Sequence, residues 1–340
     1  MKTYQDASLA PARRAKALLE EMTLAEKVGQ LNQRLYGFRI YERKCVNGED
    51  TIELSEEFCQ EVEKYSGLGV LYGLYRADPW ADKDYETGLT GVLSKKAYNQ
   101  VQRYVLEHSR LGIPVMMSSE CPHGHQALDG YLLPVNLLAG ATFDPAMVRA
   151  AYRVSGRQLQ NMGVDFALMS MLDVLRDPRW GRSEECYSED PYLSARMAEA
   201  AVIGMQESGP EVVAKHFAAQ GEGTGGVNAS AARIGERELR EIHFPPAAAA
   251  IKAGAKGIMA AYNEIDGVYC HANRWLLNDV IRKEMGFDGI VMSDGVAIDQ
   301  LDSMTGDNVM SGALALQSGV DVGLWDEAFG KLRKQCREAL

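Results

Sequence analysis

The chain has 340 residues and a formal net charge of −11, because 36 Lys and Arg stand against 47 Asp and Glu. This length fits one large domain and lies within the range of α/β barrels with insertions. The acidic balance and the lack of a basic cluster argue against nucleic acid as a partner. No apolar run approaches the length of about 18 residues that a membrane helix needs. We therefore predict a soluble, cytoplasmic protein with no membrane partner.

The sequence does not indicate a metal or a cofactor. The six cysteines, of which Cys336 is the last, lack CxxC spacing, so we expect free thiols in a reducing compartment. His123 and His125 have no third ligand type nearby in the sequence. Residues 221–226 match GxGxxG, but the next helix is expected only near Gly235, too late to bind a pyrophosphate. We predict no metal, no cofactor, and a flexible active-site loop over 221–226.

Short apolar runs alternate along the chain with amphipathic stretches of helical length. A helix is expected first over 10–22, and later ones over 145–161, 190–207 and 236–253. This alternation predicts a parallel sheet. Residues 37–50 and 75–88 are expected to be long loops, which serve either the binding site or only as solvated insertions. The expected strands cover residues 68–74, 113–120, 165–172, 212–217, 257–263, 289–294 and 320–325.

The predicted sheet is one strand short of a closed (β/α)8 barrel, which has eight. Either one strand lacks the expected periodicity, or the barrel is irregular or incomplete. An open doubly wound sheet is the alternative fold, but its ligand site lies at a single switch point. Here several strand ends carry polar residues, which favours an α/β barrel of the TIM type.

The polar strand ends include Glu120, the pair Lys215 and His216, Tyr262 and Asp294. Taken alone, Asp294 is more simply explained as the N-cap of the helix that follows it. The recurrence of such ends instead predicts an active-site rim, because α/β barrels carry their chemistry at the C-terminal ends of the strands.

Several motifs together resemble glycoside hydrolase family 3. Their order and spacing fit that family, and the similarity extends from residues 22–30 to residues 319–322. The resemblance implies that residues 1–340 form the N-terminal catalytic barrel domain of a family member. The motifs are RDPRWGR at 176–182, YSEDPYL at 187–193, KHF at 215–217, MAAYN at 259–263 and the pair Ser293–Asp294.

The resemblance also implies roles for individual residues. Asp294 would be the nucleophile, and Lys215 and Arg182 would keep it ionised by lowering its pKa. Gly295 departs from the pattern, since many β-glucosidases of the family carry there a Trp that forms a wall for the next sugar. We therefore expect the leaving-group side to be open. The sugar in the innermost subsite would be held by Glu120, which replaces the usual Asp, and by Arg182, Lys215, His216, Met259 and Tyr262.

The general acid is not evident in the sequence. Retaining hydrolysis needs a second carboxyl about 5 Å from the nucleophile to protonate the leaving oxygen. In two-domain relatives this acid comes from an α/β domain that follows the barrel, and the sequence ends at Leu340, where that domain would begin. We expect the acid to lie outside the chain, on a second domain or a homo-oligomer partner. The alternative is Glu222, the only ionisable residue in the loop over 218–230.

These expectations define one function and its alternatives. We predict a retaining exo-β-glycosidase that acts on an oligosaccharide or β-glycoside. The preferred assignment is a β-glucosidase that releases terminal non-reducing β-D-glucosyl residues through a covalent intermediate on Asp294. A β-xylosidase or β-N-acetylglucosaminidase of the same family is an alternative, and so is a catalytically silent carbohydrate-binding barrel.

Overall fold

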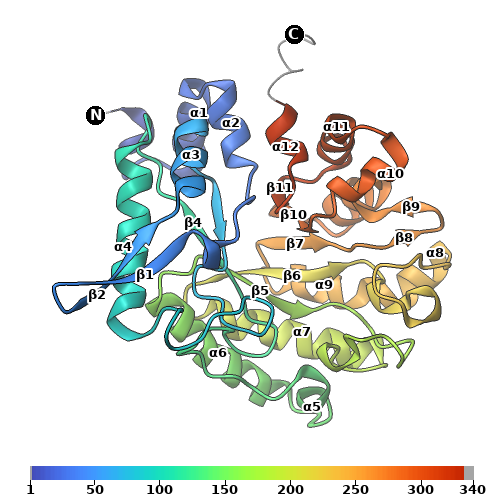
Figure 1. Ribbon diagram of the computed structural model, residues 1–340. Helices are drawn as coiled ribbons and strands as arrows, with labels where there is room; N and C mark the ends of the chain where they lie inside the picture. The colour runs from blue at the N-terminus through green and yellow to red at the C-terminus, as the bar shows by residue number, and fades with distance from the viewer. Residues whose placement is uncertain (1, 333–340) are drawn as a thin grey trace.

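Seven parallel strands form one sheet at the centre of the molecule, with helices around it (Figure 1). The computed structural model describes residues 2–332. All seven strands expected from the sequence are present, and the sheet order is β11-β10-β7-β6-β5-β4-β3. They are β3 (Val70–Tyr72), β4 (Met116–Glu120), β5 (Phe166–Met171), β6 (Glu211–Phe217), β7 (Gly257–Ala260), β10 (Ile290–Gly295) and β11 (Val322–Leu324).

An irregular segment, residues 29–36, takes the place of the eighth strand between β11 and β3. The carbonyl oxygen of Leu31 accepts a hydrogen bond from the backbone N of Gly323 at 2.9 Å, on the β11 side. On the other side, the carbonyl oxygen of Gly29 accepts one from the backbone N of Gly69 at 3.1 Å. The segment therefore joins the two sheet edges, and the barrel is nearly closed. Of the two explanations for the missing eighth strand, the irregular barrel is the one that the structure shows, because residues 29–36 form no strand and pair with β3 as a strand would only at the isolated bridge from Tyr36 to Tyr72.

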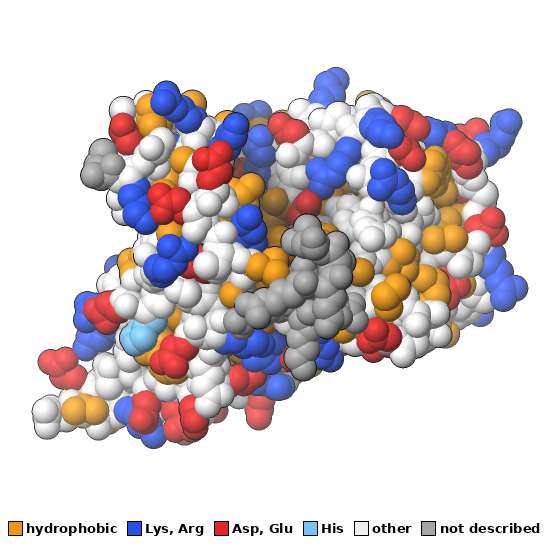
Figure 2. Space-filling model, turned by 90° about the horizontal axis from the view of Figure 1, so that it is seen from above, with side chains coloured by type: hydrophobic (Ala, Val, Ile, Leu, Met, Phe, Trp, Pro, Cys, Tyr) orange, Lys and Arg blue, Asp and Glu red, His pale blue; other side chains and the backbone are white. Residues whose placement is uncertain are grey.

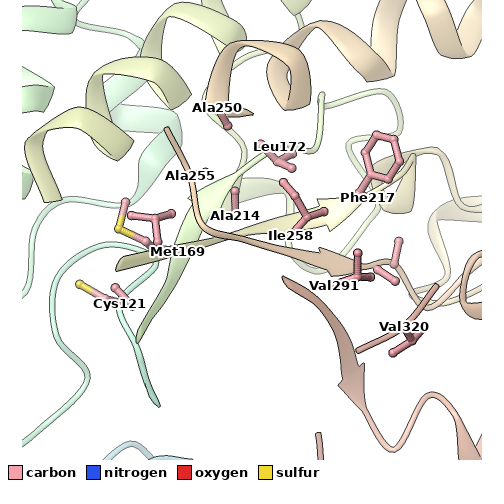
Figure 3. Packing of buried hydrophobic residues seen from close by; sticks show 14 of the residues in the cluster. Cys121, Met169, Leu172, Ala214, Phe217, Ala250, Ala255, Ile258, Val291 and Val320 are labelled. Atoms are coloured by element: carbon pink, nitrogen blue, oxygen red, sulfur yellow. The ribbon is translucent and has the colours of Figure 1, made fainter. Parts of the chain in front are cut away.

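Alternate strand residues face two different cores, as the pleat of a strand requires. Val213 and Met259 pack inside the barrel. Their neighbours Ala214 and Ile258 pack in the larger core between the strands and the helices, which Figure 3 shows. Both faces of the sheet are thus buried, which explains why the strands appear in the sequence as continuous apolar runs.

Several helices begin at residues whose side chains accept from a free N–H group of the first turn. Thr23 and Glu26 form a capping box, in which the Thr23 hydroxyl accepts from the Glu26 backbone N at 3.3 Å. Asp144 and Asp190 cap two further helices, each with Pro at the first helical position. The helices are α1 (Pro11–Glu21), α2 (Leu24–Gln30), α3 (Glu56–Tyr65), α4 (Gly91–Glu107), α5 (Asn136–Gly140), α6 (Pro145–Asn161), α7 (Pro191–Gln206), α8 (Glu236–Glu238), α9 (Phe244–Lys252), α10 (Asp302–Thr305), α11 (Asn308–Ser318) and α12 (Ala328–Lys331), with π-helical turns η6 (Leu239–His243) and η8 (Trp275–Glu284).

The helix expected over 236–253 is interrupted. The π-helical turn η6 separates α8 from α9. Pro245 and Pro246 stand just after this turn and lack the backbone N–H that regular helical bonding requires. The amphipathic period continues through the interruption, so the sequence pattern alone shows one helix.

Residues 37–50 contain a hairpin where a loop was expected. Strands β1 (Tyr41–Val46) and β2 (Glu49–Leu54) pair antiparallel. The turn residues Asn47 and Gly48 have φ values of 53° and 81°, the conformation that two-residue hairpin turns require. Asn-Gly between strand-forming residues is a hairpin signal, and the prediction of a loop overlooked it. A shorter hairpin joins β8 (Glu264–Ile265) to β9 (Val268–Tyr269).

The surface carries mixed charge. Seen from above, Lys and Arg side chains are interspersed with Asp and Glu (Figure 2). No helix within residues 2–332 is long and apolar enough to cross a membrane. Five cysteines are free thiols in this part of the chain, whereas Cys336 lies outside the described residues.

Candidate active site

The C-terminal ends of the strands border a polar cavity of about 320 Å³. Three of the residues expected to hold the sugar, Glu120, Arg182 and Lys215, line it. Side chains that carry charge or hydrogen-bonding groups on several sides of a cavity suit a ligand rich in hydroxyl groups. The cavity is lined by Arg76, Glu120, Pro122, His123, Gln126, Arg182, Glu184, Glu185 and Lys215.

Irregularities in two strands bring adjacent residues into the same site. In a regular strand, Lys215 and His216 would point to opposite faces. The register of β6 against β7 shifts between Lys215 and Phe217. The side chains of Lys215 and His216 can therefore both lie at the barrel mouth. A second shift, in β10 between Met292 and Gly295, lies where Asp294 stands. Periodicity in the sequence cannot reveal such shifts.

Asp294 has one carboxylate oxygen free. The residue is 8% exposed, and its Oδ1 accepts a hydrogen bond from the backbone N of Gly295 at 2.7 Å. Its Oδ2 lies 3.4 Å from Nε2 of His216 and has no hydrogen-bond partner among the residues that the structure describes. The His271 ring holds the backbone, since its Nε2 accepts from the Asp294 N at 3.1 Å. An oxygen that is oriented but unoccupied is what a nucleophile needs.

The explanation of Asp294 as a helix cap is wrong, because Asp326 has that role. Oδ1 of Asp326 accepts hydrogen bonds from the backbone N atoms of Ile298 at 2.9 Å and Asp299 at 3.2 Å. Its Oδ2 accepts from the Ser293 hydroxyl at 2.6 Å. Asp294 is therefore left free for chemistry, while Asp326, which follows the neighbouring strand β11, fixes the turn after β10.

Glu120 is held ionised at the wall of the cavity. Its Oε2 accepts from Nζ of Lys215 at 2.7 Å, and its Oε1 accepts from the Tyr72 hydroxyl at 3.0 Å. Burial alone would raise the pKa of Glu120, but Lys215 and Arg76 outweigh it and lower the pKa to about 2. The carboxylate can therefore accept hydrogen bonds from sugar hydroxyls at any ordinary pH.

Asp173 orients His216, a role that the sequence interpretation did not assign. Oδ2 of Asp173 lies 2.8 Å from Nδ1 of His216, so the other ring nitrogen, Nε2, faces Asp294. Oδ1 of Asp173 accepts from the backbone N atoms of Gln220 and Gly221 at 3.0 and 3.3 Å. Asp173 thus fixes both the histidine ring and the start of the loop over 221–226. Its position directly after the strand 165–172 was the available signal.

The remaining expected sugar-binding residues have different surroundings. Arg182 forms a bidentate pair with Glu185, with Nε to Oε1 at 2.7 Å and Nη2 to Oε2 at 2.9 Å. The Tyr262 hydroxyl donates to the carbonyl oxygen of Gly295 at 2.9 Å, and burial, with the Asp294 carboxylate beside it, raises the pKa of Tyr262. Met259 is 1% exposed and packs in the inner core, so it supports the site from below.

Glu222 is engaged in an ion pair. Its Oε2 lies 3.2 Å from Nε of Arg176 and 3.7 Å from Nε2 of His243. Burial raises the pKa of Glu222, although Arg176 opposes this. No contact found within residues 2–332 joins Glu222 to Asp294.

The leaving-group side next to Gly295 is not open, contrary to the sequence expectation. A Cβ atom built on Gly295 would lie 2.4 Å from Cε3 of Trp325. The Trp325 ring therefore occupies the space beside the peptide that follows the nucleophile. The expectation failed because Trp325 is 30 residues away in the sequence and reaches Gly295 only through the pairing of β11 with β10.

The two histidines near Glu120 lie in different surroundings. His123 lines the cavity, whereas His125 is buried and bonded to the Ser119 hydroxyl at 2.9 Å. Burial lowers the pKa of His125 to about 4. Within the described part of the chain, no group of three or more His, Cys, Asp or Glu is arranged to hold a metal ion.

Comparisons with known proteins agree with this arrangement. The sequence model described as "Glycosyl hydrolase family 3 N terminal domain" matches residues 23–340. A beta-xylosidase of Formosa agariphila is 34% identical over 266 residues, which are 73% of this chain and 37% of that protein. A periplasmic beta-glucosidase of Salmonella typhimurium is 31% identical over 322 residues, which are 92% of this chain and 37% of that protein.

Solved structures show the same fold. A β-glucosidase from Erythrobacter marinus superimposes with a TM-score of 0.85 at 32% identity and covers 100% of this chain and 44% of its own. A beta-glucosidase from Listeria innocua has a TM-score of 0.81 at 28% identity. The chain thus spans less than half the length of these relatives. It is similar to glycosyl hydrolases over nearly its whole length, and it belongs to glycosyl hydrolase family 3 as an N-terminal barrel domain.

Proposed function

We propose that this chain carries the sugar site and the nucleophile of a retaining exo-acting β-glycosidase, and that Asp294 forms the covalent glycosyl intermediate. The observation that supports this best is the free Oδ2 of Asp294, which faces His216 at the mouth of the barrel. A nucleophile of this kind must be ionised, oriented and accessible to the anomeric carbon. Covalent attack by a carboxylate gives retention of configuration after two displacements.

The cavity next to Asp294 supports binding of a terminal sugar. Ionised Glu120 accepts hydrogen bonds, while Lys215 and Arg182 donate them, so neighbouring hydroxyls of one ring can be bound from both sides. In the free protein Lys215 and Arg182 are paired with Glu120 and Glu185. A bound sugar would therefore meet donors and acceptors whose positions are already fixed by these ion pairs. Groups fixed in this way can stabilise the transition state more than the ground state.

We infer that the general acid comes from outside residues 1–340. Glu222 pairs with Arg176, and this cation would have to be displaced before Glu222 could deliver a proton. The relatives named above are more than twice as long as the part that this chain matches, which leaves room for a second domain in such proteins. A partner subunit is the other possible source of the acid.

For the sugar, we propose β-D-glucoside as the first substrate, as in the names of several relatives. A β-xyloside is the second candidate, because a xylosidase is among the proteins most similar in sequence. We keep the cytoplasm as the proposed compartment on the grounds of the sequence, although the Salmonella relative is named periplasmic.

A panel of 2,4-dinitrophenyl β-glycosides tests this proposal, since their leaving group needs no protonation. Glucoside, xyloside and N-acetylglucosaminide should be compared, and the anomer first released should be identified by NMR. We expect turnover that is highest for the glucoside, with the β-anomer of the product formed first. Binding of sugars without turnover of any of the three would instead identify a silent carbohydrate-binding barrel.

A further inference from the structure

A second cavity, of about 250 Å³, lies outside the ring of strands, where the first turn of α4 meets the last turn of α6. We refer to it as the outer cavity. Pockets for drug-sized ligands have volumes of roughly 300–1,000 Å³, so the outer cavity fits a smaller ligand of about one ring. Tyr75 and Asp129 line it from two loops, and the two helix ends contribute Gly91, Ser94, Lys95, Gln158, Asn161 and Met162.

The outer cavity is separate from the polar cavity at the barrel mouth, although the same two segments of the chain border both. Tyr75 and Asp129 line the outer cavity, whereas Arg76 and Gln126 line the polar one. The two segments pair through an isolated bridge between Arg76 and Ala127. Among the described residues that line these cavities, none lines both. A ligand in the outer cavity would therefore contact different residues from those that hold the terminal sugar.

The hydroxyl of Ser94 lines the outer cavity without a protein partner. Ser94 is 4% exposed, and its Oγ has no hydrogen-bond partner within residues 2–332. A buried hydroxyl without a partner costs free energy, and the large majority of buried polar side-chain atoms in native proteins are bonded. Because Ser94 borders the cavity, a ligand hydroxyl placed there would supply the missing hydrogen bond.

Two further side chains are held so that one polar atom of each remains available. Oε1 of Gln158 accepts from the backbone N of Tyr131 at 3.1 Å, which leaves the side-chain amide N to donate. Oδ2 of Asp129 accepts from the backbone N of Gly91 at 2.5 Å, which leaves Oδ1 to accept. Together with Ser94 they provide both donors and acceptors, as a ligand with several neighbouring hydroxyl groups requires.

The charges of the lining disfavour an anion. Lys95 contributes one positive charge and Asp129 one negative charge, while the other lining residues are neutral. The N-terminus of α4 would otherwise attract an anion, but the Asp129 carboxylate already accepts from its first N–H group. A phosphate or sulfate in the cavity would be repelled by this carboxylate. We therefore expect a neutral ligand.

One wall of the outer cavity is apolar. The Tyr75 hydroxyl donates to the carbonyl oxygen of Met162 at 2.6 Å, so its polar atom is already satisfied and its ring lies beside Met162. Tyr75 is buried and Met162 is half-buried. A sugar ring has a face of C–H groups that can pack against such a wall, while the hydroxyls at its edge bond to polar side chains.

We propose that the outer cavity is a second, non-catalytic binding site for a neutral ring of the size of one sugar that carries several hydroxyl groups, either a pyranose or a cyclic polyol. Ser94, Gln158 and Asp129 bond to its hydroxyls, and its C–H face packs against Tyr75. The site does not depend on the chemistry proposed for Asp294. Its affinity should be on the order of millimolar, as is usual for a ligand of so few atoms.

Hydrogen–deuterium exchange, measured by mass spectrometry, tests this site in solution. D-glucose and scyllo-inositol are the probes, and sodium sulfate is the anionic comparison. Either ring should slow the exchange of peptides that cover residues 90–95 and 158–162, and sulfate should not. Protection by both rings supports a site for either chemistry, and protection by one identifies which of the two binds.

Ser94→Ala is the most informative variant, because Ser94 has no protein hydrogen bond to lose. It should not lower the free energy of unfolding, measured in urea, but it should raise the glucose concentration for half-maximal protection by about five- to tenfold, the scale of one lost hydrogen bond. Asn161→Leu, at an exposed position of the lining, should also raise it. Ser155→Ala is the matched control, because Ser155 is a buried helical serine that also lacks a partner in the described residues but does not line the outer cavity.

Three outcomes would overturn the proposal. They are no protection of 90–95 and 158–162 by either ring well above millimolar concentration, stronger protection by sulfate than by the rings, and equal effects of Ser94→Ala and Ser155→Ala. The same experiment reports separately on peptides that contain Glu120 and Lys215. A lack of protection there would count against the proposed function and would leave the outer cavity as a binding site.

Discussion

At the scale of residues, the site consists of charges that are paired before a sugar arrives. Glu120 bonds to Lys215, Arg182 to Glu185 and His216 to Asp173. Each pair fixes the direction of a donor or acceptor, so the binding groups need little reorganisation. Asp294 differs, because its Oδ2 has no hydrogen-bond partner in the described residues and lies 3.4 Å from Nε2 of His216.

Lys215→Met should lower kcat by roughly 10- to 100-fold, with any rise in KM smaller than that, because contacts to sugar hydroxyls tighten in the transition state. Steady-state kinetics on a 2,4-dinitrophenyl glycoside measure both constants. Lys283→Met is a suitable control, since Lys283 is exposed and, within residues 2–332, pairs only with Asp279. A change in KM alone would show that Lys215 binds substrate without acting on the transition state.

The sequence predicted most of the residues of the site but not their connections. Glu120, Arg182 and Lys215 line one cavity, and His216 and Tyr262 lie against Asp294 or the residue after it. The motifs indicated these residues; most of them stand at strand ends, whereas Arg182 lies in the loop after β5. Arg76, Asp173 and Trp325 were not assigned, since their roles depend on which loops lie beside each other in space. Met259 was expected to hold sugar, but its side chain belongs to the inner core.

At the scale of elements, the buried carboxyl of Asp326 helps to hold the turn after β10. Asp326 accepts hydrogen bonds from Ser293, Ile298 and Asp299, and also from the backbone N of Leu324 at 3.1 Å. It thereby ties the end of β10 to the end of β11. Burial raises its pKa from 3.8 to about 7, although the bonded groups oppose this.

Asp326→Asn should reduce the free energy of unfolding by about 1–3 kcal/mol near pH 5.5, because the amide replaces an acceptor that faces N–H donors. The folded pKa lies above the unfolded one, so the stability contributed by Asp326 is fully present below pH 3.8 and is lost as pH rises through about 7. The difference between the two proteins should therefore shrink by pH 8.5. Urea unfolding at both pH values measures it, and a difference that grows with pH would contradict this account.

The positions of the strands were easier to predict from the sequence than the register shifts within them. The seven apolar runs gave all seven strands, because strands buried on both faces leave a strong signal. The register shifts at His216 and Asp294 follow from pairing with neighbouring strands. They leave no signal in the sequence. The helix over 236–253 was predicted as continuous, since period alone does not show that Pro245 and Pro246 break its bonding.

At the scale of the whole molecule, the gap between β11 and β3 is bridged by a segment that has no strand pattern. Residues 29–36 bridge β11 and β3 through backbone groups. Gly69 permits the close approach, because a Cβ there would lie 2.4 Å from the carbonyl oxygen of Gln30. The sequence could indicate that a strand was missing, but not which residues replace it.

Gly69→Ala should lower the free energy of unfolding by about 1–3 kcal/mol, the usual effect of forcing an atom into a packed space. Thermal or urea unfolding measures the change. The control is Gly235→Ala, where a Cβ would meet nothing within 4 Å, and it should have little effect. If both variants were equally stable, the contact between residues 29–36 and β3 would not be needed to close the barrel.

Because no general acid is assigned within this chain, its rate of hydrolysis should depend on whether the leaving group needs a proton. It should cleave 2,4-dinitrophenyl glucoside far faster than cellobiose, because only cellobiose needs a proton on the leaving oxygen. Its rate should also lack a basic limb in the pH profile, and Glu222→Gln should change little. Efficient cellobiose hydrolysis with a basic limb that Glu222→Gln removes would make Glu222 the acid.

The central claim is that Asp294 attacks the anomeric carbon, and mass spectrometry of the trapped intermediate tests it most directly. The chain should be inactivated by a 2-deoxy-2-fluoro β-glucoside with an activated leaving group, digested, and its labelled peptide sequenced. We predict one sugar on the peptide that contains Met292–Val296, and none in Asp294→Asn, whose turnover should fall by several orders of magnitude. A label on any other carboxylate, or a label that persists in Asp294→Asn, would contradict the assignment.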